Sequence, residues 1–317
     1  LEILTLSLYV LASYSNVGAI YESPLRPIEA GLKYLVMGSL ASAFLLYGIS
    51  LIYASSGSLS FGNLGGAFGQ KGNPLLFLAG ALLVLSALGF KVAAVPFHVW
   101  VPDVYQGAPT PVVGFFSVAS KAAGFAALLR ILSEAFGRLA DERQILFSVL
   151  AALTLLYGNL GALVQKDIKR LLGYSSIGHA GYLLMAVAAA KPHGEPALLY
   201  YLMAYAATNL AAFLVVAMVE RAEGSQAIEA FQGLSKRSPF LAAGMFVALL
   251  SLAGVPPLGG FFAKFYVLLA TAKKEIFWLV ILGAVNAAIS LYYYLSVVRV
   301  MYFEKPKTEI PIAVSLP

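Results

Sequence analysis

Long apolar runs, separated by short stretches rich in polar residues, glycine and proline, make up most of the chain. A helix that spans a bilayer needs about 20 mostly apolar residues, and on that measure the pattern predicts nine spans. They are 1–14, 28–53, 75–104, 109–132, 144–164, 170–190, 196–219, 239–271 and 275–303. The first is short and opens directly on LEILTLSLYVLASY, so we expect a fragment whose first helix is cut within the membrane. The pattern therefore predicts an all-α polytopic membrane protein.

The composition supports this prediction and excludes several kinds of site. Hydrophobic residues make up 60% and charged residues 11% of the chain, whereas a soluble domain has about 25% charged residues. The absence of cysteine excludes disulfides, thiolate metal sites and cysteine-ligated iron–sulfur clusters, and the three histidines lack the paired spacing of a metal site. If electrons move in this system, another chain carries them.

The basic residues gather at the ends of the predicted spans. The formal net charge of +6 would suggest nucleic acid in a soluble protein, but this distribution follows the positive-inside rule of membrane proteins. We therefore expect a lipid bilayer, and no nucleic acid, as partner. The loops after odd-numbered spans carry ten lysines and arginines against seven on the other side, which favours a cytoplasmic position for them.

The third predicted span carries ionisable and helix-breaking residues near its middle. Lys91 lies there, and a charge within the membrane usually marks an ion path or a proton relay, because its burial costs several kcal/mol. Pro96 cannot donate to the carbonyl of Val92, so the helix should be interrupted one turn beyond the lysine. His98 follows two turns after Lys91, on the same face while the helix continues.

The eighth predicted span repeats this design. Pro256 and Pro257 interrupt it in the sequence GVPPLGGFFAKF, and Lys264 follows. Two discontinuous helices about five spans apart indicate inverted-topology repeats, in which unwound backbone lines an ion site near the membrane midplane. The sequence therefore predicts two five-helix repeats within one membrane domain, the first in 1–132 and incomplete at its amino end, the second in 144–303.

Two further lysines, Lys121 and Lys33, lie at different depths within their predicted spans. Lys121 lies about twelve residues inside the fourth predicted span, too deep to reach either surface, which favours a functional role over a lysine satisfied by a neighbouring carbonyl or carboxylate. Lys33 lies near the start of the second span, where its side chain can extend to the membrane surface along its own aliphatic stem. The residues alone leave both interpretations of Lys33 open.

A histidine occupies the sixth predicted span. His179 lies in QKDIKRLLGYSSIGHAGY, with Ser175, Ser176 and Tyr182 close by in sequence. It is a candidate relay element, or alternatively a hydrogen-bonded contact between helices. His98 is the other candidate relay residue.

The motifs of these predicted spans resemble a known family. The stretches GFKVAAVPFHVWVPDVYQGAPTPV, SVASKAAGFAALLRIL, QKDIKRLLGYSSIGHAGY and GVPPLGGFFAKF are similar to the antiporter-like subunits of respiratory complex I and of Mrp antiporters and membrane-bound hydrogenases. Within this family, PDVYQG is typical of the subunit N type of NADH-quinone oxidoreductase, because sister subunits have PDA at this point.

The resemblance implies an antiporter-like fold of 14 transmembrane helices with two inverted five-helix repeats, of which this chain would hold the fifth to the thirteenth helices. It also assigns roles by position. The implied roles are a charge pair for Glu2 and Lys33, the broken-helix lysine of the first half-channel for Lys91, the connecting lysine for Lys121, and the broken-helix lysine of the second half-channel for Lys264.

The function implied by the resemblance is proton translocation by one subunit of a translocase in a prokaryotic plasma membrane. The charge pair would change how strongly Lys91 holds its proton, which would pass through Lys121 to Lys264. We expect no cofactor in this chain, since NADH, flavin, iron–sulfur clusters and quinone would be bound by other subunits. Its partners would be neighbouring antiporter-like subunits and small membrane subunits of complex I.

Two alternatives remain open from the sequence. The chain could belong to an Mrp-type cation/proton antiporter or a membrane-bound hydrogenase, although PDVYQG and the scarcity of midspan carboxylates disfavour a Na⁺ carrier, since hard cations need oxygen ligands. It could also be a structural scaffold of the membrane arm in which the buried lysines only specify helix packing.

Overall fold

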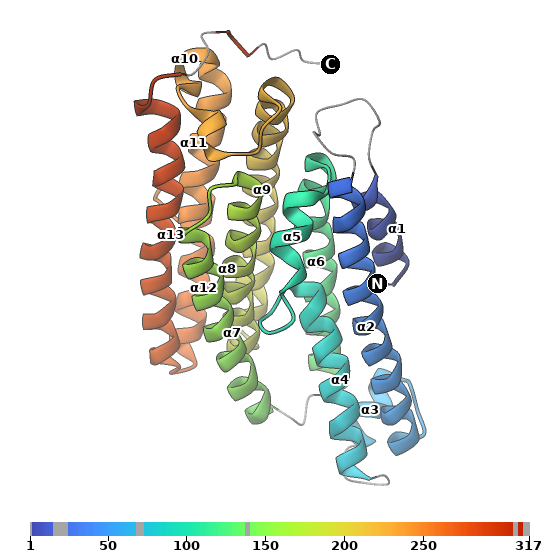
Figure 1. Ribbon diagram of the computed structural model, residues 1–317. Helices are drawn as coiled ribbons and strands as arrows, with labels where there is room; N and C mark the ends of the chain where they lie inside the picture. Colours follow the sequence, from blue (N-terminus) through green and yellow to red (C-terminus); the bar gives the residue numbers. More distant parts are fainter. Residues whose placement is uncertain (1, 15–24, 68–72, 137–139, 307–309, 313–317) are drawn as a thin grey trace.

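The computed structural model describes residues 2–14, 25–67, 73–136, 140–306 and 310–312 (Figure 1). Within this part the chain forms helices that run side by side and are joined by short turns. The only pairing of strand type in the described ranges is an isolated β-bridge between Asp167 and Ala227. The predicted all-α class is confirmed.

The helices follow one another along the chain with few residues between them. They are α1 (Glu2–Ser13), α2 (Leu25–Ser56), α3 (Phe61–Ala67), α4 (Pro74–Val92), α5 (Trp100–Gly107), α6 (Thr110–Glu134), α7 (Ala140–Leu163), α8 (Ile168–Ala189), α9 (Gly194–Glu223), the 3₁₀-helix η1 (Ile228–Phe231), α10 (Leu234–Arg237), α11 (Pro239–Ala253), α12 (Gly259–Lys273) and α13 (Phe277–Phe303).

Seven of the described helices, α2, α4, α6, α7, α8, α9 and α13, are long and apolar enough to cross a membrane. Each coincides with one of the nine predicted spans. The predicted span 239–271 is divided between α11 and α12, and the span 1–14 corresponds to α1, which has 12 residues. The prediction of a polytopic membrane protein is confirmed, and the number of crossings stays a prediction.

Both predicted helix breaks are present, each within a turn of its proline. α4 ends at Val92 because Ala93 adopts a left-handed conformation with φ of 63°, and α5 begins only at Trp100. α11 ends at Ala253, where Gly254 has φ of 89°, and α12 begins at Gly259. A left-handed residue after the last turn is a common helix end, because its N–H satisfies free carbonyls of that turn.

The chain passes the two breaks in opposite directions. In Figure 1, α4 lies in the lower half of the molecule and leads upward into α5, whereas α11 lies in the upper half and leads downward into α12. Inverted-topology repeats would produce this arrangement. The boundaries of the two repeats at 1–132 and 144–303 stay a prediction.

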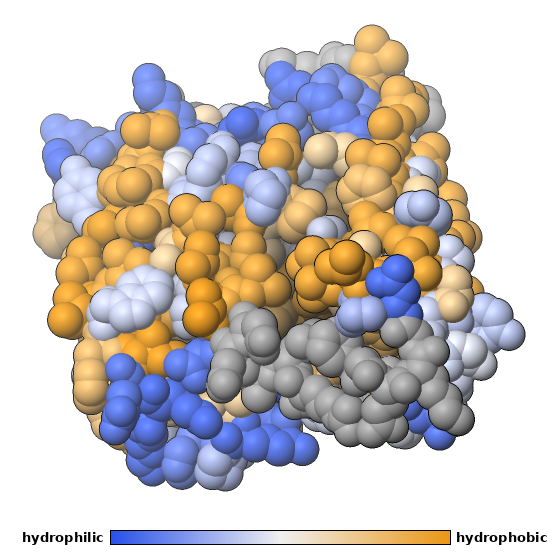
Figure 2. Space-filling view, turned by 90° about the horizontal axis from the view of Figure 1, so that it is seen from below, coloured by the Kyte–Doolittle hydropathy of each residue, from blue (hydrophilic) through white to orange (hydrophobic). Residues whose placement is uncertain are grey.

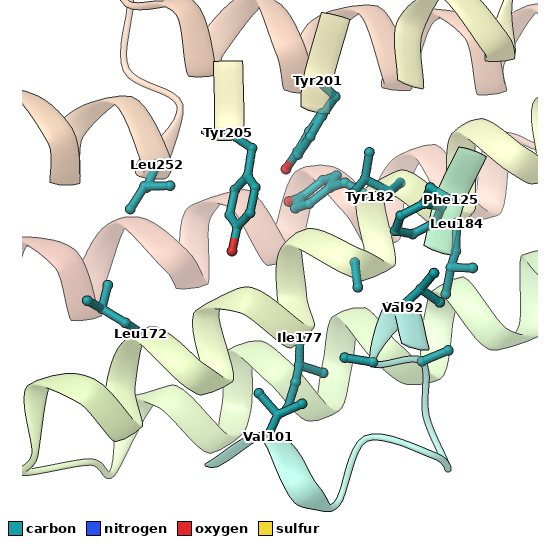
Figure 3. Packing of buried hydrophobic residues seen from close by; sticks show 14 of the residues in the cluster. Val92, Val101, Phe125, Leu172, Ile177, Tyr182, Leu184, Tyr201, Tyr205 and Leu252 are labelled. Carbon is teal, nitrogen blue, oxygen red and sulfur yellow. The ribbon is translucent and has the colours of Figure 1, made fainter. Parts of the chain in front are cut away.

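α8 lies at the centre of the second half and is buried along nearly its whole length. α7 approaches it closely because two glycines meet: a Cβ added to Gly158 would lie 2.3 Å from the backbone nitrogen of Gly178. α8 also contacts α5, α9 and α12, and Figure 3 shows Ile177 and Tyr182 among the buried side chains of this region. Side chains on α8 can therefore reach most of the elements that carry candidate residues.

The lower end of the molecule, seen in Figure 2, shows hydrophilic residues gathered in separate patches with hydrophobic side chains between them. Large exposed hydrophobic residues cover the flanks of the helices, among them Leu46, Leu153 and Met203. An apolar surface of this extent on helices of spanning length is the surface expected against lipid.

Candidate functional site

Lys91 is buried in the last turn of α4, directly before the first break. Its ammonium donates a hydrogen bond to the hydroxyl of Thr5 on α1. The side chain fits against α6 at a glycine, since a Cβ added to Gly124 would lie 3.3 Å from Cβ of Lys91. Glu2 precedes Thr5 by three residues in α1, but its side chain lies outside the described residues.

Lys121 is buried in the middle of α6 and reaches across to α8. Its Nζ donates to the Ser176 hydroxyl at 2.6 Å and to the Ser176 carbonyl. The same Nζ lies 5.2 Å from the centre of the Tyr205 ring, and the Tyr205 hydroxyl donates to Ser176 Oγ at 3.1 Å. Lys121 therefore contacts neutral oxygens and an aromatic face.

Lys264 is buried in α12 and is bonded to the end of α11. Its Nζ donates to the Ala253 carbonyl at 2.7 Å and to Ser290 Oγ of α13 at 3.1 Å. Pro257 has no N–H with which to occupy that carbonyl in a continuous helix. The prediction that the second break exposes a backbone acceptor next to its lysine is confirmed.

His179 lies on α8 between these two lysine sites. Nδ1 is 2.7 Å from the Tyr201 hydroxyl of α9, and Nε2 is 3.1 Å from the Tyr294 hydroxyl of α13. The centre of its ring is 5.0 Å from that of Tyr205, which contacts Lys121. Tyr182 stacks on Tyr201 with ring centres 6.0 Å apart, and its ring centre lies 5.2 Å from Nζ of Lys264.

A band of polar and aromatic side chains, joined partly by hydrogen bonds and partly by ring contacts, thus runs between the two lysines through the buried interior. We call it the polar row, and it consists of Lys121, Ser176, Tyr205, His179, Tyr201, Tyr182 and Lys264. All of its members are buried, and Figure 3 shows three of its tyrosines among the surrounding apolar side chains.

His98 lies apart from the polar row. It is buried beside the first break, with its ring edge-on to Tyr157 of α7 at 4.1 Å between centres. Among the described residues neither ring nitrogen makes a hydrogen bond of good geometry. The structure therefore separates the two histidines that the sequence offered as candidate relay residues.

Lys33 has a different environment from the other lysines. Its side chain is 44% exposed and forms ion pairs with Glu29 at 2.8 Å and with Asp103 of α5 at 3.0 Å. Asp103 also pairs with Arg170 of α8 at 2.8 Å. The described partners of Lys33 are thus Glu29 and Asp103, whereas the implied pair with Glu2 falls on a side chain outside the described residues.

A second charged group lies buried near the start of α8. Lys169 is fully buried, donates to the Ala108 carbonyl at 2.7 Å and lies 3.8 Å from Glu220. Glu220 also accepts hydrogen bonds from Thr110 and Gln226. This cluster ties the loop between α5 and α6 to α8 and α9, so the basic start of α8 is more than a solvated helix end.

Asp167 caps this start of α8. Its carboxylate accepts a hydrogen bond from the Arg170 backbone N–H at 2.9 Å and another from Gln106 at 3.2 Å. Burial raises the pKa of the Asp167 carboxyl. In the described ranges, no group of three or more histidine and acidic side chains is placed to bind a metal ion.

Most of the chain is similar to one known protein family. The sequence model described as "NADH:quinone oxidoreductase/Mrp antiporter, TM" matches residues 1–290. The chain belongs to this family. The resemblance proposed from the motifs at the two breaks is confirmed.

Within the NADH:quinone oxidoreductase/Mrp antiporter family, the chain is 43% identical to NADH-quinone oxidoreductase subunit N of Desulforamulus reducens, over 99% of this chain and 64% of the relative. A chain of respiratory complex I from Thermus thermophilus with bound aureothin is 38% identical with a TM-score of 0.81, over 99% of this chain and 66% of that chain. A chain of the Mrp complex from Dietzia sp. DQ12-45-1b is 27% identical with a TM-score of 0.89, over 96% and 56%. The chain therefore spans less than two thirds of the length of these relatives.

The structure brings some of the predicted site residues together and places others apart. It joins Lys121, His179 and Lys264 through the polar row, and it places Lys91 next to the first break. Tyr201 and Tyr205 of the row were missed, because they are two of 18 tyrosines in the chain. One signal was available: Tyr201 and Tyr205 are four residues apart and so share a face of the predicted span 196–219.

Proposed function

We propose that the chain is a proton-translocating membrane subunit of an NADH-quinone oxidoreductase, which couples quinone reduction elsewhere in the complex to proton pumping. The polar row is the single observation that carries this proposal. It runs between two buried lysines through serine, tyrosine and histidine side chains, whose hydroxyl and imidazole groups can both donate and accept a hydrogen bond. Its remaining links are ring contacts, and all of its members are buried. The name of the Desulforamulus reducens relative supports the same reading.

In the proposed sequence of events, Lys91 takes up a proton and passes it through bound water to Lys121. The polar row then carries it past His179 to Lys264, which releases it at the exit half. Glu2 lies on the helix that contacts Lys91, so a change in its position alters how strongly Lys91 holds its proton. Because the groups interact, their titrations are coupled, and none has a pKa of its own.

Lys33 enters this scheme at the upper end of the bundle and not within the row. Its ion pair with Asp103 joins α2 to α5, the short helix that follows the first break. Arg170 on the same carboxylate extends the connection to α8, which carries Ser176 and His179. Movement of α2 would therefore reach the polar row through α5 and α8.

Cation transport is the alternative that the Mrp complex of Dietzia sp. brings forward. Sodium binding requires several oxygen ligands, usually including carboxylates. The described contacts of Lys121 and Lys264 are two serine hydroxyls, two carbonyls and aromatic faces, and each place is occupied by a lysine ammonium. This chemistry favours protons over sodium.

The redox reaction is assigned to other subunits. We infer that NADH, flavin, iron–sulfur clusters and quinone are bound by them, and that this chain contacts neighbouring antiporter-like and small membrane subunits of the same complex. Its place in the enzyme is then that of a translocase subunit.

The experiment that tests this function uses the complete complex reconstituted into proteoliposomes. Proton uptake into the lumen and ²²Na⁺ uptake are measured during NADH oxidation, with wild type and Lys264→Met side by side. The proposal predicts proton uptake that Lys264→Met abolishes, and no sodium uptake. Sodium uptake driven by a proton gradient would support the antiporter, and unchanged proton uptake in the variant would support a scaffold.

A further inference from the structure

A groove of about 270 Å³ lies between α9 and α12 at the lower end of the bundle, away from the polar row. The two helices contribute residues at matching one-turn intervals, among them His193, Ala197 and Tyr200 from α9 and its cap, and Tyr266, Ala270 and Lys273 from α12. This spacing places each set on one face of its helix, so the groove follows the seam between the two helices.

The groove changes character along its length. Its mouth, at the start of α9 and the end of α12, carries His193 and Lys273. Deeper in, alanines form its walls, and the rings of Tyr200 and Tyr266 meet edge to face with centres 5.2 Å apart. The groove therefore has a cationic mouth and an apolar, aromatic interior.

The charges around the mouth leave Lys273 available to a ligand. Glu195, an acidic residue on the first turn of α9, pairs with Lys191 at 3.6 Å. Lys273 has no ion-pair partner among the described residues. An anion at the mouth would thus meet a lysine whose charge is not already matched.

From this geometry we propose that the groove binds one membrane phospholipid with an anionic headgroup. The phosphate lies at Lys273 and His193, and an acyl chain follows the seam of α9 and α12 onto the tyrosine pair. The position of the groove favours this occupant, because α9 is long and apolar enough to span a membrane, and the ends of such a helix are expected at the level of lipid headgroups. Tyrosine at this depth is typical of the membrane interface.

Such a lipid would connect two helices that carry the polar row. α9 holds Tyr201 and Tyr205, and Lys264 lies nine residues before Lys273 on α12, about two and a half turns away. A lipid in the seam would set how closely α12 approaches α9, and with it the distance from Lys264 to the row tyrosines of α9. This consequence rests on the proposed function, whereas the lipid site does not.

Native mass spectrometry of the complete complex, stripped of lipid and then titrated with phosphatidylglycerol, tests the site. Lys273→Gln should bind its tightest phosphatidylglycerol about fivefold more weakly, the expected effect of one lysine near an anionic headgroup. Adding His193→Gln should weaken it further. Lys274→Gln is the matched control, because it removes the same charge from the next residue, which does not line the groove.

Three results would overturn the proposal. Equal lipid binding by Lys273→Gln and Lys274→Gln would show that the groove is not the site. Full competition by soluble glycerol 3-phosphate would show an anion site that does not hold an acyl chain. Protein density in the groove in a map of the complete complex would show that another segment of protein fills it. None of these measurements depends on proton pumping, so the site and the proposed function can fail separately.

Discussion

The two interrupted helices carry the same elements, a lysine beside a proline break, but they connect them differently. Lys91 precedes its break, lies in the last turn of α4 and donates to Thr5 of another helix. Lys264 follows its break and donates to the Ala253 carbonyl that the break itself leaves free. The first lysine therefore depends on α1, whereas the second depends on the backbone of its own span and on Ser290 of α13. This difference predicts that the second lysine responds to a change at its own proline break, whereas the first responds to a change in α1.

The largest loss of proton pumping is expected for the two broken-helix lysines, Lys91 and Lys264, because both halves of the molecule have one. Lys91→Met and Lys264→Met both remove the ionisable group while keeping most of the side-chain volume. Each should lower proton pumping by about 100-fold or more, the usual contribution of a group that transfers protons. The measurement is the initial rate of lumen acidification by the assembled complex in proteoliposomes, and Lys274→Gln serves as the surface control. Wild-type pumping in either variant would remove that lysine from the path.

The second largest loss of pumping is expected for a change at Glu2, which lies in the first half of the molecule. Glu2→Gln removes a charge from the helix that contacts Lys91, and a change of one unit in the pKa of a coupled group corresponds to a factor of ten. We expect pumping to fall at least tenfold in Glu2→Gln and less in Glu2→Asp, which keeps the carboxylate but shortens its reach. Steady-state pumping rates of the two variants check this. Equal activity of Glu2→Gln and wild type would make Glu2 a bystander.

The connection between the halves gives a third test, for which the chain supplies a matched pair of histidines. His179→Gln should lower pumping about tenfold, because water can replace a bridging ring only in part. His98→Gln should leave pumping within about twofold of wild type, since His98 lies outside the polar row. The two variants are compared at equal assembly, judged by subunit content of the purified complex. The opposite ranking would place the path along α5 and α7.

The smallest predicted effect is a difference in pumping between proline variants at the two breaks. Pro257→Ala restores an N–H that can compete with Lys264 for the Ala253 carbonyl, and a hydrogen bond worth about 1 kcal/mol corresponds to a loss of about fivefold in pumping. Pro96→Ala should lose less, because the described hydrogen bond of Lys91 goes to the Thr5 hydroxyl of α1. Parallel pumping assays with both variants provide the comparison. Equal losses would mean that the two breaks act in the same way.

The sequence predicted those features that depend on a single residue in its own helix. Pro96 and Pro257 lack an N–H, so the breaks followed from local chemistry, and Lys121 lay too deep in an apolar run to escape burial. Features that need two helices to meet were not predictable in this way. The contact of Lys33 with Asp103 joins residues 70 positions apart, and the polar row requires α6, α8, α9 and α12 together.

The central claim is that the polar row carries protons between the two halves, and Lys121 is its entry. The most direct measurement is the number of protons pumped per NADH oxidised by the complete complex with Lys121→Met, in proteoliposomes whose leak rate has been matched to wild type. The account predicts a lower proton yield per NADH with quinone reduction still measurable. A wild-type yield in Lys121→Met, with the variant fully assembled, would contradict it.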